Sequence, residues 1–143
     1  MEENKDCIFC KIIKKEIPSS IVYENDKFLA ILDIAQFTEG HTVVLPKEHF
    51  RFIWDIPYIK DFYEFIIKVG NHFRKIGYTY VDTLSFGRKV PHTHVHLVPH
   101  NGDNEEWKTA LSLIGAMQTD PKRRIDKQRG DKILKLLKIS ELI

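Results

Sequence analysis

Four of the chain's seven histidines lie within the ten residues from Pro91 to His100. His92, His94 and His96 occupy every second position, and alternate side chains of a β-strand point to the same face. The spacing therefore predicts a row of three imidazoles on one side of a strand. Imidazole titrates near neutral pH and can act as a nucleophile, a proton carrier or a metal ligand. The alternative is a solvated strand face or an accidental metal clip, although Thr, Lys or Glu would suit such a face better.

Cys7 and Cys10 are the only cysteines of the chain, and two residues separate them. A Cys-x-x-Cys pair together with two distant histidines can supply the four ligands of a tetrahedral structural zinc site. One alternative is a redox pair, which would need a strand-helix-strand context that these residues, placed before the first predicted strand, do not have. The other is two reduced, half-buried thiols.

With 143 residues, 43% of them hydrophobic, the chain can form one domain with its own core. No run reaches the ~18 apolar residues of a membrane span, and the charged start Met1–Asp6 does not look like a secretory signal. We therefore expect a cytoplasmic protein without a membrane partner.

The net charge of +2 argues against a nucleic-acid-binding surface spread over the whole chain. The charge is uneven, however, because Pro121 to Lys138 contains eight Lys or Arg residues and two Asp residues. A basic tail of this kind is most often a solvated helix face, and contact with a polyanionic ligand or nucleic acid is the alternative.

Hydrophobic patterns predict an antiparallel sheet of about five strands with one long helix packed on it, an α+β fold. The predicted strands are 21–23, 27–33, 41–45, 80–86 and 90–98. From Ile56 to Ile76 apolar residues recur every three or four positions, which predicts a helix with one buried stripe, ended at Gly77. A short helix is expected over 7–15, and two more over 104–117 and 121–137. We expect residues 1–100 to form the core and 101–143 to form a C-terminal helical extension of the same domain.

The pattern from His92 to Val98, His-x-His-x-His followed by two apolar residues, resembles the signature of the histidine triad superfamily of nucleotide hydrolases and transferases. Other segments resemble the family in its order and at about its spacing; they are Cys7–Ile12, Glu16–Pro18, Leu32–Ile34 and Gly40–His49. The resemblance covers about residues 7 to 100. It implies the same α+β fold and a homodimer with a continuous sheet.

The resemblance also implies roles for three histidines. His94 would be the nucleophile that attacks the α-phosphorus of a nucleotide and forms a covalent nucleotidyl-histidine. His96 would donate hydrogen bonds to phosphate oxygens. His41 would complete the group from a neighbouring strand, and a histidine satisfied by backbone groups is the alternative there.

In the zinc-bearing members that this chain resembles, the ligands correspond to Cys7, Cys10, His49 and His92, so a structural zinc ion is expected. Asp33 looks like the family's ribose ligand. Positions that line the family's pocket for a purine base correspond to Phe9, Ile12, Ile17 and Ile34, for which ordinary core packing is the alternative.

One segment departs from the family's pattern. Many relatives carry Gly-Gly-Gln-Ser/Thr-Val before the triad, whereas this chain has Gly87-Arg88-Lys89-Val90. Arg88 and Lys89 would replace small phosphate donors with cations that suit a more anionic substrate or leaving group. His100 likewise stands where the family often has Arg.

The expected activity is hydrolysis or nucleotidyl transfer at the α-phosphate of a dinucleoside polyphosphate or a nucleoside phosphoramidate. The alternative from another class is a zinc-stabilised nucleotide-binding or partner-binding module without efficient turnover.

Overall fold

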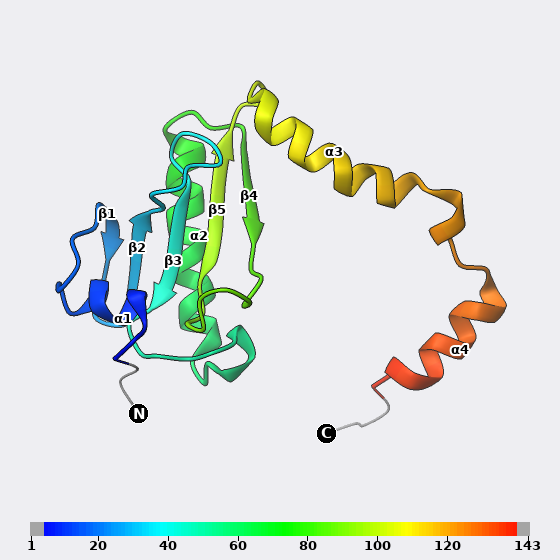
Figure 1. Ribbon diagram of the computed structural model, residues 1–143, viewed down its shortest axis with the longest axis horizontal. Coiled ribbons are helices and arrows are strands. Elements are labelled where there is room, and N and C mark those ends of the chain that lie inside the picture. The colour runs from blue at the N-terminus through cyan, green and yellow to red at the C-terminus, as the bar shows by residue number, and fades with distance from the viewer. Residues whose placement is uncertain (1–4, 140–143) are drawn as a thin grey trace. The chain divides into compact units, whose positions relative to one another are not determined.

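The computed structural model describes residues 5 to 139 and contains two compact units, residues 1–107 and 108–143. In its described part, the first unit holds a five-stranded antiparallel sheet with the spatial order β1-β2-β3-β5-β4 (Figure 1). The strands are β1 (Ile21–Glu24), β2 (Phe28–Leu32), β3 (Thr42–Pro46), β4 (Tyr80–Leu84) and β5 (Val95–His100). The sheet and its helices confirm the predicted α+β class.

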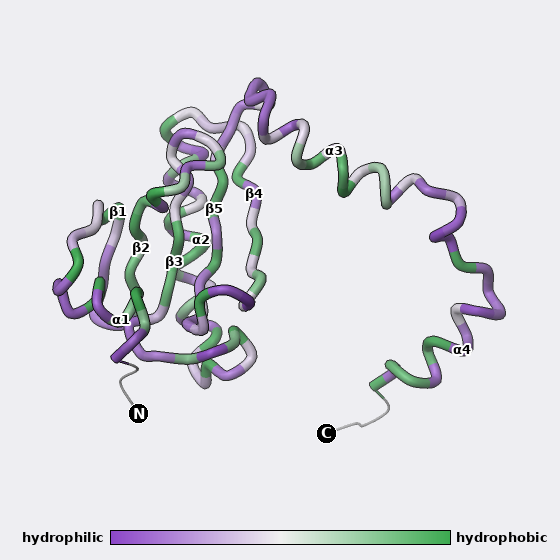
Figure 2. Tube along the Cα trace, in the orientation of Figure 1, coloured by the Kyte–Doolittle hydropathy of each residue, from purple (hydrophilic) through white to green (hydrophobic). Residues whose placement is uncertain are grey.

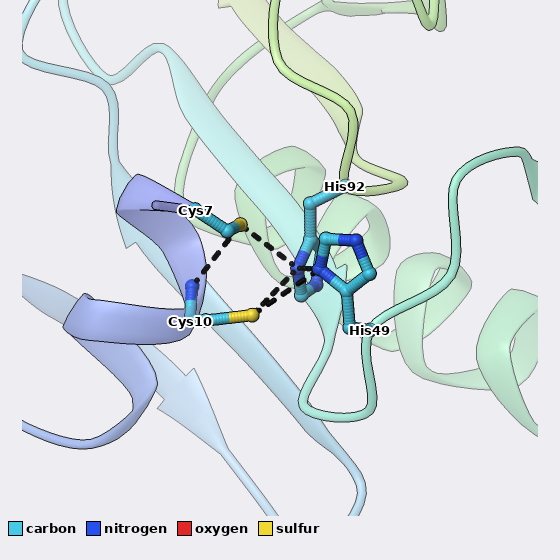
Figure 3. Close-up of side chains that lie close together, drawn as sticks. All are labelled: Cys7, Cys10, His49 and His92. Carbon is cyan, nitrogen blue, oxygen red and sulfur yellow. Dashed lines mark hydrogen bonds between the residues drawn. The ribbon is translucent and has the colours of Figure 1, made fainter. Parts of the chain in front are cut away.

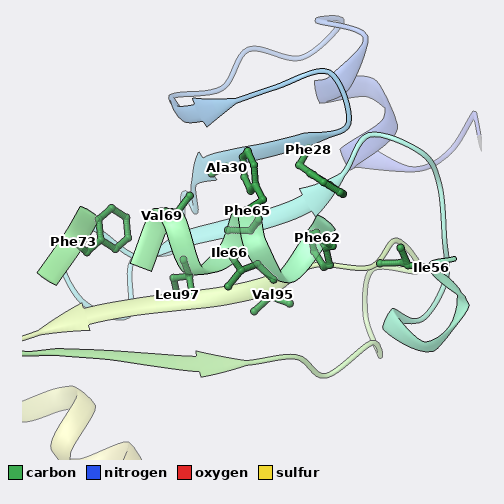
Figure 4. Packing of buried hydrophobic residues seen from close by; sticks show 11 residues of the cluster. Phe28, Ala30, Ile56, Phe62, Phe65, Ile66, Val69, Phe73, Val95 and Leu97 are labelled. Atoms are coloured by element: carbon green, nitrogen blue, oxygen red, sulfur yellow. The ribbon is translucent and has the colours of Figure 1, made fainter. Parts of the chain in front are cut away.

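One face of the sheet is covered by α2 (Ile59–Lys75), as the helical spacing of its apolar residues predicts. The helix begins two residues after Pro57, later than its predicted start at Ile56. Figure 4 shows the core between helix and sheet, which contains Phe28, Ala30, Val44, Ile56, Phe62, Phe65, Ile66, Val69, Phe73, Val95 and Leu97. This burial fixes which side chains of each strand turn away from α2.

The opposite face is covered in part by α1 (Ile8–Ile13). Phe9, Ile12 and Ile13 of this helical segment pack on a second core cluster formed by Leu29, Ile31, Val43 and Leu45. These are the residues of β2 and β3 that alternate with the ones under α2, and both strands are strongly hydrophobic in Figure 2.

The central pairing of β3 with β5 places Val43 opposite His96. Because β5 also pairs with β4, His96 lies opposite Leu84 on its other side. His96 therefore projects from the middle of the sheet, on the face that Val43 shares with α1.

The strand predicted over 90–98 is wrong in its bounds, because β5 begins at Val95. Ahead of it, the Thr93 N–H donates to the Phe50 carbonyl at 2.7 Å, and His92 Nε2–H donates to the Pro46 carbonyl at 2.7 Å. These bonds tie the segment to the last residue of β3 and to the loop that follows it, without a strand ladder. His92 and His94 consequently precede the strand that carries His96.

The second unit continues α3 (Glu105–Thr119), which begins in the first unit, and adds α4 (Lys127–Leu137). A 3-10 turn, η2 (Pro121–Arg123), separates the two helices, and the Asp126 carboxylate caps α4 by accepting from the Arg129 N–H at 2.8 Å. The predicted division at residue 100 stays a prediction. Within the described residues, no helix has the length and apolar character needed to cross a bilayer.

Candidate active site and candidate metal centre

His94 is half-buried, and one backbone contact determines its tautomer. Its Nδ1 lies 2.8 Å from the carbonyl oxygen of His92. A carbonyl oxygen can only accept, so the proton sits on Nδ1 and Nε2 keeps a lone pair. The rings of Phe9 and His96 each lie 5.0 Å from the His94 ring, in edge-on contact. The segment thus presents an imidazole with one nitrogen ready to attack an electrophile.

His41 and His96 are joined directly through their ring nitrogens. His41 Nε2 lies 2.9 Å from His96 Nδ1, and His41 is fully buried. The carboxylate oxygen Oδ2 of Asp33 lies 3.7 Å from His41 Nε2 and 3.8 Å from His96 Nδ1. The ends of β2, β3 and β5 therefore bring a carboxylate and two imidazoles together.

The contacts of His41 Nδ1 determine which of the two rings, His41 or His96, donates the hydrogen bond between them. His41 Nδ1 lies 2.9 Å from the Ala35 carbonyl oxygen and 3.2 Å from the Phe37 backbone nitrogen. One atom cannot donate to the first and accept from the second, and the shorter contact is to a group that can only accept. We therefore place the proton of His41 on Nδ1, so that His96 Nδ1–H donates to His41 Nε2.

Burial, the largest cause, acts with the neighbouring His94 and His41 and against the Asp33 carboxylate to lower the pKa of His96 to about 4. His96 is thus neutral near pH 7 when no anion is bound.

The loop between β2 and β3 is fastened by Gln36, which sequence reasoning did not single out. Its side-chain amide donates to the backbone carbonyls of Asp33 and His41, and its side-chain oxygen accepts from the Gly40 N–H at 2.8 Å. The Ala35 N–H donates to Asp33 Oδ1 at 2.8 Å, which leaves Oδ2 on the histidine side. A single amide in a polar loop has no spacing signal that would have revealed this role.

Two aromatic residues that the sequence did not flag support His41. Phe37 stacks on the His41 ring at 4.3 Å between centroids, and Trp107 stacks on Phe37 at 5.4 Å. Trp107 is 7% exposed, and its Nε1–H donates to Asp82 Oδ2 at 2.8 Å. Trp107, in the first turn of α3, therefore supports His41 through the ring of Phe37, which stacks between them.

A second cluster unites Cys7, Cys10, His49 and His92 (Figure 3). The two sulfur atoms come from the start of α1, His49 from the loop after β3, and His92 from the segment before β5. Cys10 Sγ lies 3.2 Å from His49 Nδ1, Cys7 Sγ lies 3.5 Å from His92 Nδ1, and the two Nδ1 atoms are 3.1 Å apart. The fold thus gathers four N and S donors from three segments that lie far apart in the sequence.

The spacing of these donors fits a tetrahedral zinc ion. Zinc bonds of usual length place N and S donors about 3.3 to 3.8 Å apart, close to the 3.1 to 3.5 Å observed. His92 Nε2–H is bonded to the Pro46 carbonyl, so its Nδ1 is free of a proton and faces the sulfur atoms. Burial, the largest cause, lowers the pKa of His92 to about 4, which keeps the imidazole neutral as a metal ligand must be.

The candidate metal centre and the candidate nucleophile are connected through His92. Its side chain belongs to the Cys and His cluster, and its carbonyl oxygen accepts the proton of His94 Nδ1. Phe9, on the segment that carries both cysteines, touches the rings of His92 and His94. A fixed arrangement of the Cys and His side chains therefore helps to orient the His94 ring.

The remaining predicted nucleotide contacts are less closely gathered. Ile12 packs on the core between β2 and β3, Ile17 is half-buried, and the Ile34 side chain is fully exposed. Arg88 and Lys89 are exposed. The Phe86 ring beside them in sequence lies 6.1 Å from the His96 ring, so this loop borders the histidines.

Two surface hollows of about 320 and 240 Å³ lie on the α2 side of the sheet, away from the histidines. They are lined by residues such as Phe65 and Ile66 of α2. Neither hollow is lined by His41, His94 or His96, or by a residue of the Cys and His cluster.

The antiparallel α+β sheet, with three neighbouring histidines beside a Cys and His cluster, matches a known family of proteins. The model of the HIT domain matches residues 14–103. "Protein hit" of Bacillus subtilis is 37% identical over 120 residues, which cover 73% of this chain and 81% of that protein. The chain belongs to the HIT family, the histidine triad family.

Two further relatives extend the comparison. The adenosine 5'-monophosphoramidase HNT1 of Saccharomyces cerevisiae is 35% identical over 120 residues, covering 80% of this chain and 73% of that protein. A solved HIT family protein of Bacillus anthracis superposes with a TM-score of 0.76 at 31% identity, covering 93% of this chain and 95% of that one. The likeness thus includes most of the residues beyond the HIT domain.

Proposed function

We propose that the protein is a nucleotide hydrolase or nucleotidyl transferase that works through a covalent nucleotide on His94. The observation that carries the proposal is the bond from His94 Nδ1–H to the His92 carbonyl, because it leaves Nε2 as a lone-pair nucleophile beside the pair formed by His96 and His41. The similarity to a relative named as an adenosine 5'-monophosphoramidase supports a phosphorus-centred reaction.

In the first step, the Nε2 lone pair of His94 forms a bond to the α-phosphorus, and the bond from phosphorus to the leaving group breaks. The leaving group departs with the bonding electrons and takes up a proton from solvent. The His94 ring becomes cationic, so its Nδ1–H bond to the His92 carbonyl becomes charge-assisted and stronger as the bond forms.

His96 stabilises the charge that grows on the phosphate oxygens. A bound phosphate adds negative charge to that of Asp33, and this favours protonated His96 over the neutral form. Protonated His96 donates through Nδ1 to His41 and through Nε2 to the phosphate. The His41 Nδ1–H bond to Ala35 holds His41 in the tautomer that this arrangement needs.

In the second step, water or another acceptor attacks the phosphorus, the bond to His94 Nε2 breaks, and a proton is released to solvent. Asp33 would bind the ribose hydroxyls through Oδ2, and Phe9, Ile12, Ile17 and Ile34 would line the side of a purine base.

Cys7, Cys10, His49 and His92 would hold a zinc ion that contributes folding free energy and takes no part in the reaction. This arrangement would keep His92, and through its carbonyl His94, in place during both steps.

Arg88 and Lys89 would favour a polyphosphate leaving group, so we propose dinucleoside polyphosphates before nucleoside phosphoramidates as substrates. Purified protein incubated with both classes, with adenine and guanine as bases, tests this when the products are identified by mass spectrometry. We expect release of a nucleoside monophosphate, and a preference for polyphosphates that declines as salt is raised. Absence of any product with both substrate classes would contradict the proposed activity.

A further inference from the structure

We propose that Asp33, His41 and His96 form a second metal site, which takes a divalent transition-metal ion such as Zn²⁺ or Co²⁺ in the absence of nucleotide. The three residues offer one donor atom each, Oδ2, Nε2 and Nδ1, and these atoms lie within 4.8 Å of one another. The donors contain no sulfur, so this site differs in chemistry from the cluster of Cys7 and Cys10.

The geometry needs little change to hold an ion. Tetrahedral zinc with N and O ligands places its donors about 3.3 to 3.5 Å apart. The two distances from Asp33 Oδ2 are 3.7 and 3.8 Å, and the two imidazole nitrogens are 2.9 Å apart. The rings must separate by about 0.4 Å, which His96 at the partly open side can do.

His41 is already arranged as a metal ligand. Its Nδ1–H donates to the Ala35 carbonyl, the type of second contact that orients metal-bound imidazoles, and this leaves Nε2 with its lone pair on the side of His96 and Asp33. His96 Nδ1 coordinates once its proton has moved to Nε2 of the same ring. The ion then replaces the hydrogen bond between the two rings without a change in the total number of protons on the pair.

Imidazole donors select the kind of ion. Sites with two imidazoles and one carboxylate favour zinc, cobalt, nickel or copper, whereas magnesium and calcium prefer oxygen ligands alone. Three protein ligands leave the fourth tetrahedral position open to water. The site is therefore expected to be weaker and more readily exchanged than the four-ligand cluster.

The ion would be bound by Asp33 Oδ2 and His96 Nδ1 at the same time, so metal binding and nucleotide binding would exclude each other. This exclusion rests on the proposed function, because it assumes that Asp33 binds ribose. Metal binding itself does not depend on any activity and can be measured separately.

The test adds Co²⁺ to full-length protein that already holds one equivalent of zinc. We expect a second ion to bind, with the visible absorption of cobalt bound by N and O and no charge-transfer band from a thiolate. Asp33→Asn should weaken this Co²⁺ binding on the order of 10- to 100-fold, at least the loss typical of changing a supporting residue. Asp61→Asn, which alters a surface carboxylate paired with Lys27, should bind Co²⁺ like the wild type.

The inference is overturned if no second Co²⁺ binds, if cobalt appears only with the thiolate band, or if Asp33→Asn matches the wild type. Should Asp33→Asn fail to fold, His96→Gln decides in its place, with the same expected loss and the same contradicting result. If the wild-type protein shows no nucleotide turnover without Co²⁺ but binds the second Co²⁺ in a separate titration, the result counts against the proposed function alone.

Discussion

At His94 a single hydrogen bond decides which ring nitrogen can react. The acceptor is the backbone of His92, so no side-chain substitution elsewhere supplies or removes it directly. The pair formed by His41 and His96 has a similar arrangement, with the Ala35 carbonyl as the outer partner. Backbone groups thus fix the tautomers of the histidines, and the side chains are left to meet the substrate.

Two buried histidines should make the stability of the metal-free protein depend on pH. The pKa values of His92 and His96 are lowered to about 4 from 6.5. As pH falls below 6.5 the unfolded chain binds protons that the folded chain still resists, so stability present above 6.5 is lost toward pH 4. The loss is at most about 1.4 kcal/mol per pH unit for each histidine.

Denaturant unfolding at pH 7, 6 and 5 in the presence of a chelator measures this dependence. His96→Gln removes one of the two titrating groups and should make the dependence on pH shallower. His72→Gln, which changes an exposed histidine of α2, serves as the matched control and should unfold like the wild type. Equal slopes for His96→Gln and the control would contradict the assignment.

The helix α1 is the shortest of the described α-helices, and it contacts both the candidate metal centre and His94. Its start supplies the cysteine sulfurs, and Phe9 touches the His94 ring. The proposed zinc would hold this segment on the sheet, because so short a helix has little stability of its own.

Cys10→Ala should therefore abolish tight zinc binding and lower the free energy of unfolding by at least about 3 kcal/mol. Metal analysis of freshly purified protein and thermal unfolding check the two effects, with about one zinc per chain expected for the wild type. Ile8→Ala, on an exposed position of the same helix, should retain the metal. The zinc assignment would be contradicted if wild-type protein held far less than one equivalent of zinc and did not take up zinc when it was added.

Trp107, in the first turn of α3, should help to orient His41 and His96 through its contact with Phe37. Replacing the indole in Trp107→Leu removes the ring that stacks on Phe37 and the bond to Asp82. We expect kcat to fall on the order of tenfold while KM changes little, because His41 and His96 lose orientation and not a substrate contact.

Steady-state kinetics on a nucleotide substrate would measure this effect, with Trp54→Leu as the control. Trp54 is 88% exposed, so its loss should leave both constants unchanged. A rise in KM alone, or equal behaviour of the two variants, would show that Trp107 does not position the histidines.

At the level of the whole molecule, the sequence was informative where chemistry repeats at a fixed spacing. The alternation of His92, His94 and His96 pointed to residues of the candidate active site and the candidate metal centre, and the helical period pointed to α2. The start of β5 at Val95 could not be found in this way, since it depends on bonds from residues 92 and 93 to the end of β3 and the loop after it.

The supporting residues were missed for a related reason. Phe37 and Trp107 are single aromatic residues 70 positions apart, and only the folded chain stacks them. Gln36 is an ordinary polar loop residue until its amide is seen to reach two carbonyls. The family resemblance predicts the nucleophile and the metal ligands, whereas the side chains that orient them emerge only from tertiary contacts.

The resemblance also predicts a homodimer with a continuous sheet. β4 is an edge strand of the five-stranded sheet, so a second chain can add to its free side. Light scattering on a concentration series should give twice the chain mass of 16.8 kDa. A mass of one chain at every concentration would exclude the predicted dimer.

The central claim is that His94 carries the nucleotide. Wild-type protein is mixed with a substrate labelled at the α-phosphate, quenched rapidly in base, and digested for mapping. We expect an acid-labile, base-stable label on the peptide that contains His94. His94→Asn should fold, still bind nucleotide and lose at least ~10³-fold in rate with no label, while His72→Asn behaves like the wild type. Label on another residue, or a normal rate in His94→Asn, would contradict the account.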